Sequence, residues 1–233
     1  MRDALLAIIP DTVRTFELRC LLLEEGTQLR GDANAAVVWN DRWRLVMPHG
    51  SPEPALVDAV LAGLPAGQMW RIFAGADRPS YGARWVWETA SFFGPGDPAP
   101  LEYLRSIRTP DVRPMTAEDI RRDVPPQAAP ILLDALTRGS VIGGWVKGEL
   151  AAFAFSLLRS ERYFHPSLVS FGSFAGGSMA RRIARVVAAL VAEETATGRL
   201  PAMAIADSNV AAIKGCTMMG FEPLGKRWVA TLR

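Results

Sequence analysis

The stretch that decides the fold covers residues 170–221 and reads SFGSFAGGSMARRIARVVAALVAEETATGRLPAMAIADSNVAAIKGCTMMGF. It begins with an apolar segment at 171–175, which predicts a strand, and continues through a loop of small residues at 175–180. Apolar side chains then recur at helical spacing, which predicts an amphipathic helix that Ser178 can cap. The order is therefore strand, small-residue loop and helix.

A second strand and a last helix complete the stretch. Residues 200–206 are almost continuously apolar and predict another buried strand. Asn209 suits the N-cap of the next helix, because its side chain can accept a backbone N–H of the first turn. Gly220 is the predicted stop, directly before Phe221.

The loop between the first strand and its helix can bind phosphate. Backbone N–H groups at the positive end of a helix favour an anion, and Gly176 and Gly177 allow a close approach of the backbone. Arg181 adds positive charge in the first turn. The loop is neither a P-loop nor a dinucleotide fingerprint. A tight turn with no ligand is the alternative interpretation.

Composition narrows the class of protein. The chain has 233 residues, of which 49% are apolar and 21% charged, and its net charge is +2. It can build a sizeable core, and no basic cluster with interleaved aromatic residues points to nucleic acid. Its apolar helical run is well short of the ~20 residues of a membrane span. One cysteine in each half is not a disulfide framework, and the apolar run ended by Pro10 is too short for a signal peptide. We expect a cytoplasmic protein without a membrane or nucleic-acid partner.

The clearest break in the chain is the glycine- and proline-rich segment at 94–100, which predicts two domains, 1–100 and 101–233. The first ~30 residues read as helical. Strands are expected at 35–40 and 42–47 as a hairpin, and again at 69–74 and 84–93. Between them, Ser51 and Pro52 predict the N-cap and first position of a helix.

The second domain has its own local signals. An extended segment at 109–114 leads to Thr116, which can cap a helix with acidic residues in its first turn. A helix is expected at 128–136. Residues 141–158 predict a hairpin with Lys147 and Gly148 at its turn.

From about Thr109 onward, the chain resembles the GNAT superfamily of acyl-CoA-dependent N-acyltransferases. The family's loop pattern is Arg/Gln-x-x-Gly-x-Gly/Ala. Residues 175–180 lie in that register, with Ala180 matching and with Ser178 and Ala175 departing from it. The family also shows Asn, a small residue three later, Tyr seven later, and Gly-Phe at eleven and twelve. Those offsets are occupied here by Asn209, Ala212, Cys216, Gly220 and Phe221.

The resemblance implies an α/β fold (an α+β mixed sheet) of GNAT type, with an N-terminal α/β extension or degenerate GNAT-like repeat. Two parallel strands, at 171–175 and 202–206, would splay apart and admit the pantetheine arm of acetyl-CoA, the implied cosubstrate; no metal is implied. The implied cofactor-binding residues are Phe174, Ala175, Gly176, Gly177, Ser178, Met179, Ala180, Arg181 and Asn209.

The implied reaction is direct attack of a neutral amine, from a small molecule or a peptide, on the thioester. It needs a base for the amine, an oxyanion donor and a proton for the leaving thiolate. Cys216, in place of the family's Tyr, is the candidate acid, and Asp207 and His165 are candidate bases. A small buried residue is the alternative for Cys216, and an exposed turn residue for His165. The rival function is a non-catalytic acyl-CoA-binding sensor or scaffold. Monomer and homodimer both stay open.

Overall fold

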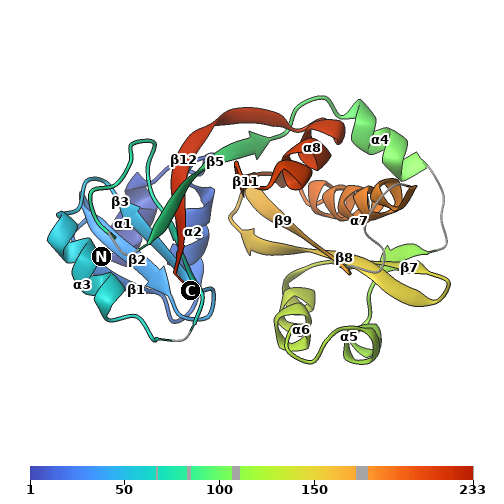
Figure 1. Ribbon diagram of the computed structural model, residues 1–233, viewed down its shortest axis with the longest axis horizontal. Helices are drawn as coiled ribbons and strands as arrows, with labels where there is room; N and C mark the ends of the chain where they lie inside the picture. Colours follow the sequence, from blue (N-terminus) through green and yellow to red (C-terminus); the bar gives the residue numbers. More distant parts are fainter. Residues whose placement is uncertain (67, 83–84, 107–110, 172–177, 233) are drawn as a thin grey trace. The chain divides into compact units, whose positions relative to one another are not determined.

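The computed structural model describes residues 1–66, 68–82, 85–106, 111–171 and 178–232, without the side chains of 178–182 and 232 (Figure 1). Two mixed sheets with flanking helices confirm the predicted α/β class. The chain forms two compact units. Unit 1 comprises Met1–Phe93, Ala204–Ile213 and Pro223–Arg233, and unit 2 comprises Gly94–Met203 and Lys214–Glu222.

Helices and strands follow one another along the described chain. The N-terminal part contains α1 (Arg2–Ile8), α2 (Phe16–Leu23), β1 (Gln28–Gly31), β2 (Ala36–Asn40), β3 (Leu45–His49), α3 (Pro54–Ala62), β4 (Trp70–Phe73) and β5 (Val86–Gly94). The middle part contains α4 (Ala99–Ser106), β6 (Val112–Pro114), α5 (Ala117–Asp123), α6 (Ala129–Arg138), β7 (Val141–Val146), β8 (Glu149–Arg159) and β9 (Tyr163–Ser170). The C-terminal part contains α7 (Ser178–Thr195), β10 (Leu200–Pro201), β11 (Met203–Ala206), α8 (Val210–Met218) and β12 (Glu222–Leu232).

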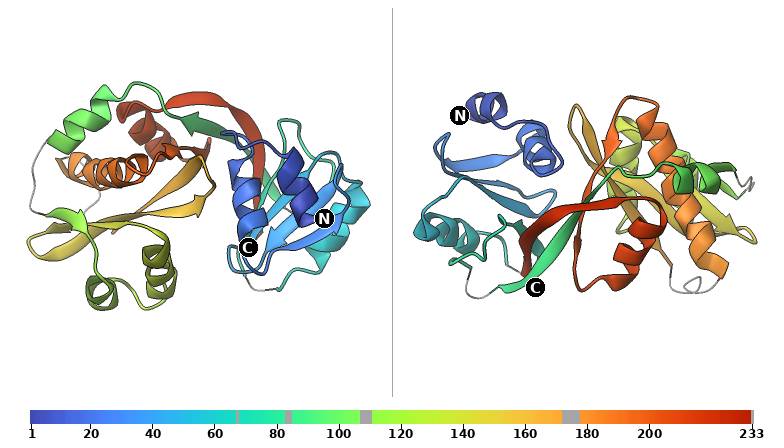
Figure 2. Two further views of the ribbon diagram at one scale, coloured as in Figure 1. Left: turned by 180° about the vertical axis from the view of Figure 1, so that it is seen from behind. Right: turned by 90° about the horizontal axis from the view of Figure 1, so that it is seen from above.

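The seven-stranded sheet has the order β1-β2-β3-β4-β12-β5-β11. The last strand of the chain, β12, therefore lies between two strands of the N-terminal part. It runs antiparallel to β4, with Val229 opposite Phe73. The predicted hairpin of β2 and β3 is confirmed. Helix α3 connects β3 to β4, and these two strands pair in parallel. Helices α1 and α2 lie on one side of this part of the sheet and α3 on the other (Figure 2).

A buried ion pair joins β12 to α2 inside unit 1. Arg227 pairs with Glu17, and both side chains are almost completely excluded from solvent. The guanidinium of Arg227 also lies 4.0 Å from the ring centre of Phe73 and 4.5 Å from that of Phe92. Burial lowers the pKa of Arg227 below its ordinary value, and the attraction of Glu17 opposes that shift. The pair holds β12 by charge as well as by backbone hydrogen bonds.

Unit 2 is built on the sheet β10-β9-β8-β7-β6. Helix α7 covers one face, and α5 and α6 cover the other (Figure 1). Ile120, Leu132 and Phe153 are buried in the core between α5, α6 and the sheet. The predicted β7–β8 hairpin is confirmed. Its two turn residues, Lys147 (φ 53°) and Gly148 (φ 84°), both have the positive φ that a type I′ turn requires.

The predicted cap at Thr116 is confirmed and is a full capping box. The Thr116 hydroxyl accepts the Asp119 N–H at 3.1 Å, and the Asp119 carboxylate accepts the Thr116 N–H at 2.9 Å. Arg113 forms two hydrogen bonds to Asp119, which hold the pKa of that carboxyl far below its usual range. Local chemistry therefore fixes the start of α5 as the sequence indicates.

One local prediction is wrong, and one helix was not predicted. Helix α3 is capped at Glu53 and begins at Pro54, not at Ser51 and Pro52. Glu53 is extended (ψ 133°), because a residue before proline is excluded from helical backbone angles, so the helix can begin only after the second proline. The glycine- and proline-rich segment at 94–100 also runs into an unpredicted helix, α4, where Asp97 accepts the Ala99 N–H at 3.0 Å.

Removing one partner of the buried pair tests its role. We expect Glu17→Gln to lower the free energy of unfolding by about 3–5 kcal/mol, because Arg227 would keep a buried charge without its carboxylate. Urea unfolding followed by circular dichroism measures this. The matched control is Glu25→Gln in the same unit, an exposed site, with an expected change of under about 0.5 kcal/mol. Equal losses in the two variants would contradict a special role for the pair.

Candidate functional site

The centre of the candidate site is the strand–helix–strand unit β9-α7-β10 of unit 2. β10 runs parallel to β9 and pairs with it only at Tyr163 and Phe164, and the Ala202 N–H then donates to the Phe164 carbonyl at 2.9 Å. The next strand, β11, belongs to the other sheet, beside β5. The carboxyl-terminal part of β9 therefore pairs with β8 on one edge. On its other edge, it is not paired with β10.

The divergence predicted between strands at 171–175 and 202–206 stays a prediction, because residues 172–175 lie outside the described part of the chain. β9 ends at Ser170, and Phe171 follows it outside any strand. The apolar run at 200–206 is two short strands, β10 and β11, instead of one. Ala202 interrupts the run, and β10 and β11 pair in different sheets.

Four of the nine predicted cofactor-binding residues lie outside the described part of the chain. They are Phe174, Ala175, Gly176 and Gly177. For Ser178, Met179, Ala180 and Arg181 only the backbone of α7 is described. The described part of that helix is Ser178–Thr195, and the cap predicted at Ser178 stays a prediction. The contact of all these residues with acetyl-CoA stays a prediction as well.

Asn209 lies where the sequence places it. Its side-chain oxygen accepts the Ala212 N–H at 3.1 Å and caps α8. The helix ends as predicted: Gly220 has φ 85°, and the Phe221 N–H donates to the Cys216 carbonyl at 3.0 Å. The cap is confirmed, and a contact with the cosubstrate stays a prediction.

Cys216 is buried on α8, with its Sγ 3.4 Å from the Met203 Sδ. Burial raises the pKa of its thiol to about 12. An ordinary thiol has a pKa of about 8.5, so proton transfer from Cys216 to a leaving thiolate would be strongly uphill. The geometry favours the alternative interpretation of Cys216 as a packing residue.

Asp207 is held in a network that sequence reasoning missed. Its carboxylate accepts hydrogen bonds from Lys226 at 2.7 Å, Thr89 at 2.6 Å and Ser91 at 2.7 Å. The bond from Lys226, followed by that from Thr89, lowers the pKa of Asp207 to about 2. A carboxylate this acidic is a weak base at neutral pH. The signal for the network was the alternation of Thr89 and Ser91, which places two hydroxyl side chains on the same face of β5.

His165 is a strand residue, and the interpretation as an exposed turn residue is wrong. It lies on β9, half-buried, between Phe164 and Pro166. It is the first residue of β9 beyond the two that pair with β10. Of the three candidate catalytic residues, His165 is therefore the one at the divergence of the strands.

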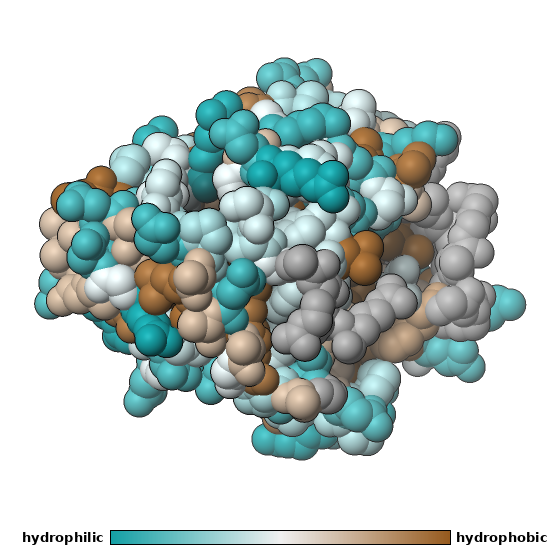
Figure 3. Space-filling view, turned by 60° about the vertical axis from the view of Figure 1, so that its left-hand side comes forward, coloured by the Kyte–Doolittle hydropathy of each residue, from teal (hydrophilic) through white to brown (hydrophobic). Residues whose placement is uncertain are grey.

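Hydrophilic and hydrophobic residues both reach the surface of the molecule. On the face shown in Figure 3, hydrophilic residues cover much of the surface, and hydrophobic residues occur in several separate places. No helix within the described ranges has the length and apolar character to cross a membrane. The described side chains include no group of three or more His, Cys, Asp or Glu that could hold a metal ion.

Comparison with known proteins identifies the fold. No protein-family model matches the sequence, and no curated protein matches it. Solved structures match almost the whole chain. A GCN5-related N-acetyltransferase-like protein from Streptococcus suis has a TM-score of 0.71 at 14% identity, over 99% of this chain and 96% of its own.

Two further structures agree with the first. A GCN5-related N-acetyltransferase from Kribbella flavida has a TM-score of 0.59 at 13% identity, over 94% of this chain and 93% of its own. A tandem GNAT protein from the clavulanic acid biosynthesis pathway has a TM-score of 0.57 at 14% identity, over 99% and 93%. The protein therefore has a GNAT-like α/β fold, as the sequence resemblance implied.

The network around Asp207 predicts a pH-dependent contribution to stability. Asp207→Asn should lower the free energy of unfolding by about 1 kcal/mol at pH 7, because Lys226 is largely exposed and its charge is screened. The pKa of Asp207 is lower in the folded than in the unfolded chain, where it is about 3.9. The contribution is therefore complete above about pH 4 and is lost as the pH falls toward 2.

Urea unfolding at pH 7, 4 and 3 measures the difference between the wild type and Asp207→Asn. Asp3→Asn, at an exposed position of α1, is the control. A difference that stays constant or grows as the pH falls would contradict the assigned network.

Cys216 gives a separate prediction about catalysis. In an acyl-transfer assay, Cys216→Ala should keep its turnover within about twofold, because the thiol is too weak an acid to serve. The variant should lose about 1–2 kcal/mol of stability through the small cavity beside Met203. A hundredfold loss of turnover in a variant that still folds would restore Cys216 to the mechanism.

Proposed function

We propose that the protein is an acyl-CoA-dependent N-acyltransferase that moves an acetyl group from acetyl-CoA to an amine. The proposed acceptor is a small-molecule or peptide amine, and the proposed setting is the cytoplasm. Solved structures described as N-acetyltransferases share the fold over nearly the whole chain. Their low identity makes the activity an inference from the fold and the site.

The observation that carries the proposal is the edge of β9. After Phe164, β10 no longer pairs with this strand, so peptide groups on that edge can hydrogen-bond an extended ligand. The pantetheine arm of acetyl-CoA is extended and carries amide groups. The start of α7, at Ser178, suits its pyrophosphate. Asn209 and the residues at 174–181 are the proposed binding residues.

The proposed chemistry needs one proton acceptor near this edge. An imidazole can accept a proton at neutral pH, and His165 lies at the divergence of the strands. We assign it the role of general base for the attacking amine, directly or through water, and the protonated imidazole would then give that proton to the leaving thiolate. A backbone N–H of the residues after β9 would stabilise the oxyanion.

We further propose that unit 1, including the C-terminal segments that complete its sheet, is a diverged GNAT-like repeat, and that the chain first passes from one domain to the other near residue 100. Both units contain a strand, a helix and a second strand parallel to the first: β3-α3-β4 and β9-α7-β10. The similarity to a tandem GNAT protein over 99% of the chain supports this proposal.

Binding and turnover test the function separately. Isothermal titration calorimetry of the full chain with acetyl-CoA should give a Kd of about 1–100 μM. Thiol release should then depend on an amine from a panel of small amines and peptides. Binding without acceptor-dependent release would favour a non-catalytic sensor. No binding would exclude both functions.

The role of His165 has its own test. His165→Gln should lower kcat by about 100- to 1000-fold with little change in acetyl-CoA binding, because only the proton transfer is lost. Ser167→Ala is the matched control, since it lies two residues further on the same face of β9. Similar losses in both variants would indicate a packing effect of the strand.

A further inference from the structure

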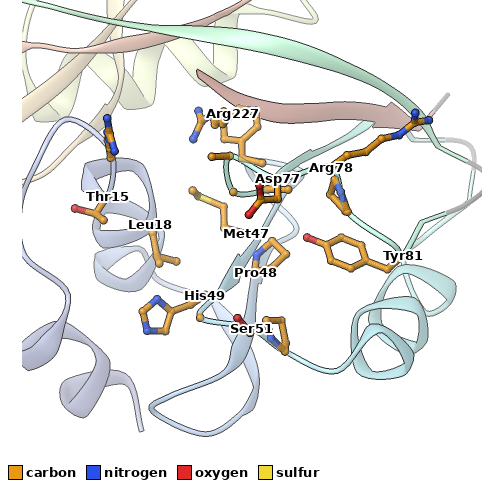
Figure 4. Close-up of a pocket in the computed structure, with 18 of the residues that line it drawn as sticks. Thr15, Leu18, Met47, Pro48, His49, Ser51, Asp77, Arg78, Tyr81 and Arg227 are labelled. Atoms are coloured by element: carbon orange, nitrogen blue, oxygen red, sulfur yellow. The ribbon is translucent and has the colours of Figure 1, made fainter. Parts of the chain in front are cut away.

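Unit 1 contains a pocket of about 510 Å³ that none of the predicted site residues lines. Its lining includes Met47, Pro48 and His49 at the end of β3, and the segment from Phe73 to Tyr81 after β4 (Figure 4). Because β3 and β4 are parallel, both strands end at this pocket. Ligands of parallel sheets bind at the carboxyl ends of the strands, and this volume suits a small molecule.

The lining carries an excess of positive charge. It contributes four permanent cations and one carboxylate, which are Arg14, Arg78, Lys226, Arg227 and Asp77. Lys226 and Arg227 already have carboxylate partners in Asp207 and Glu17.

Arg14 and Arg78 have no such partner among the described side chains. Arg14 donates a hydrogen bond to the Leu224 carbonyl at 3.3 Å. The Arg78 guanidinium lies 5.4 Å from the ring centre of Trp228. Both residues are exposed, and neither contact neutralises a charge. The pocket therefore presents a positive potential to a ligand that enters it.

The rest of the pocket combines apolar surface with hydrogen-bond donors. Leu18, Met47 and Phe92 are buried and form apolar parts of the lining. Burial raises the pKa of Tyr81 to about 12, so its hydroxyl stays protonated and can donate. In Figure 4 this hydroxyl points toward Pro48 across the pocket. An organic molecule with an anionic group matches this combination better than an inorganic ion does.

We infer that the pocket of unit 1 is a second ligand site, which binds an organic anion of metabolite size separately from acetyl-CoA. Arg14 and Arg78 at the rim supply the charge, and Tyr81 supplies a hydrogen bond. The carboxylate or phosphate of the ligand faces the arginines, and its carbon skeleton covers the apolar lining.

Calorimetric titration of the full chain with citrate and with glycerol 3-phosphate tests the inference and separates carboxylate from phosphate recognition. At low ionic strength, at least one probe should bind with a Kd below about 1 mM. Arg14→Gln and Arg78→Gln should each weaken that binding about tenfold, because each removes a charge-assisted contact. Both sites are exposed, so the variants should fold, which thermal unfolding checks.

The matched control is Arg30→Gln on β1, an exposed arginine of the same unit outside the lining. It should change anion binding by less than about twofold. Titration of the same variants with acetyl-CoA should give the wild-type Kd, so failure of this inference and failure of the proposed function are distinguishable. Three results would overturn the inference: neither probe binds, all three variants lose binding equally, or Arg78→Gln abolishes acetyl-CoA binding.

Discussion

The ion pair between Glu17 and Arg227 fixes the last strand of the chain in the sheet that the first strands begin. Arg227 lies on β12 and contacts Phe73 of β4 and Phe92 of β5, the two strands that flank it. A buried pair is costly to break, because each charge would lose its partner without gaining water. Unit 1 therefore depends on residues more than 200 positions away in sequence from α2, and its sheet can be complete only when the whole chain is present.

This sharing of strands also limits the pairing of β9 with β10 in the described part of the chain. The chain after α7 pairs with β9 at two residues and then enters the seven-stranded sheet as β11. Asp207, directly after β11, is fixed there by Thr89 and Lys226. Because β11 is bound to β5, it cannot extend the pairing of β10 with β9. The end of the pairing between β9 and β10 thus follows from pairing in the other sheet.

The sequence predicted correctly those helix caps and turns that depend on residues close together in the chain. Thr116 and Asn209 cap their helices as expected, and Lys147 forms the turn of its hairpin, because each depends on contacts within a few residues. The position of β12 could not be predicted in this way, since strand order depends on pairing between distant segments. The predicted start of α3 was wrong for a local reason. Pro54 keeps Glu53 out of helical backbone angles, so the helix begins at Pro54 and not at Pro52.

In the candidate site, too, the sequence predicted the position of a residue but not its chemistry. Cys216 follows Asn209 by seven residues, which is about two helical turns, so the two lie on the same side of α8. The family spacing therefore located Cys216 correctly on the helix. Its chemistry is set by Met203 and the surrounding core, which exclude water and keep the thiol protonated. In the proposed reaction, the proton would therefore be handled by another element. His165 on β9 is the proposed residue, since β10 pairs with β9 only as far as Phe164 in the described part of the chain.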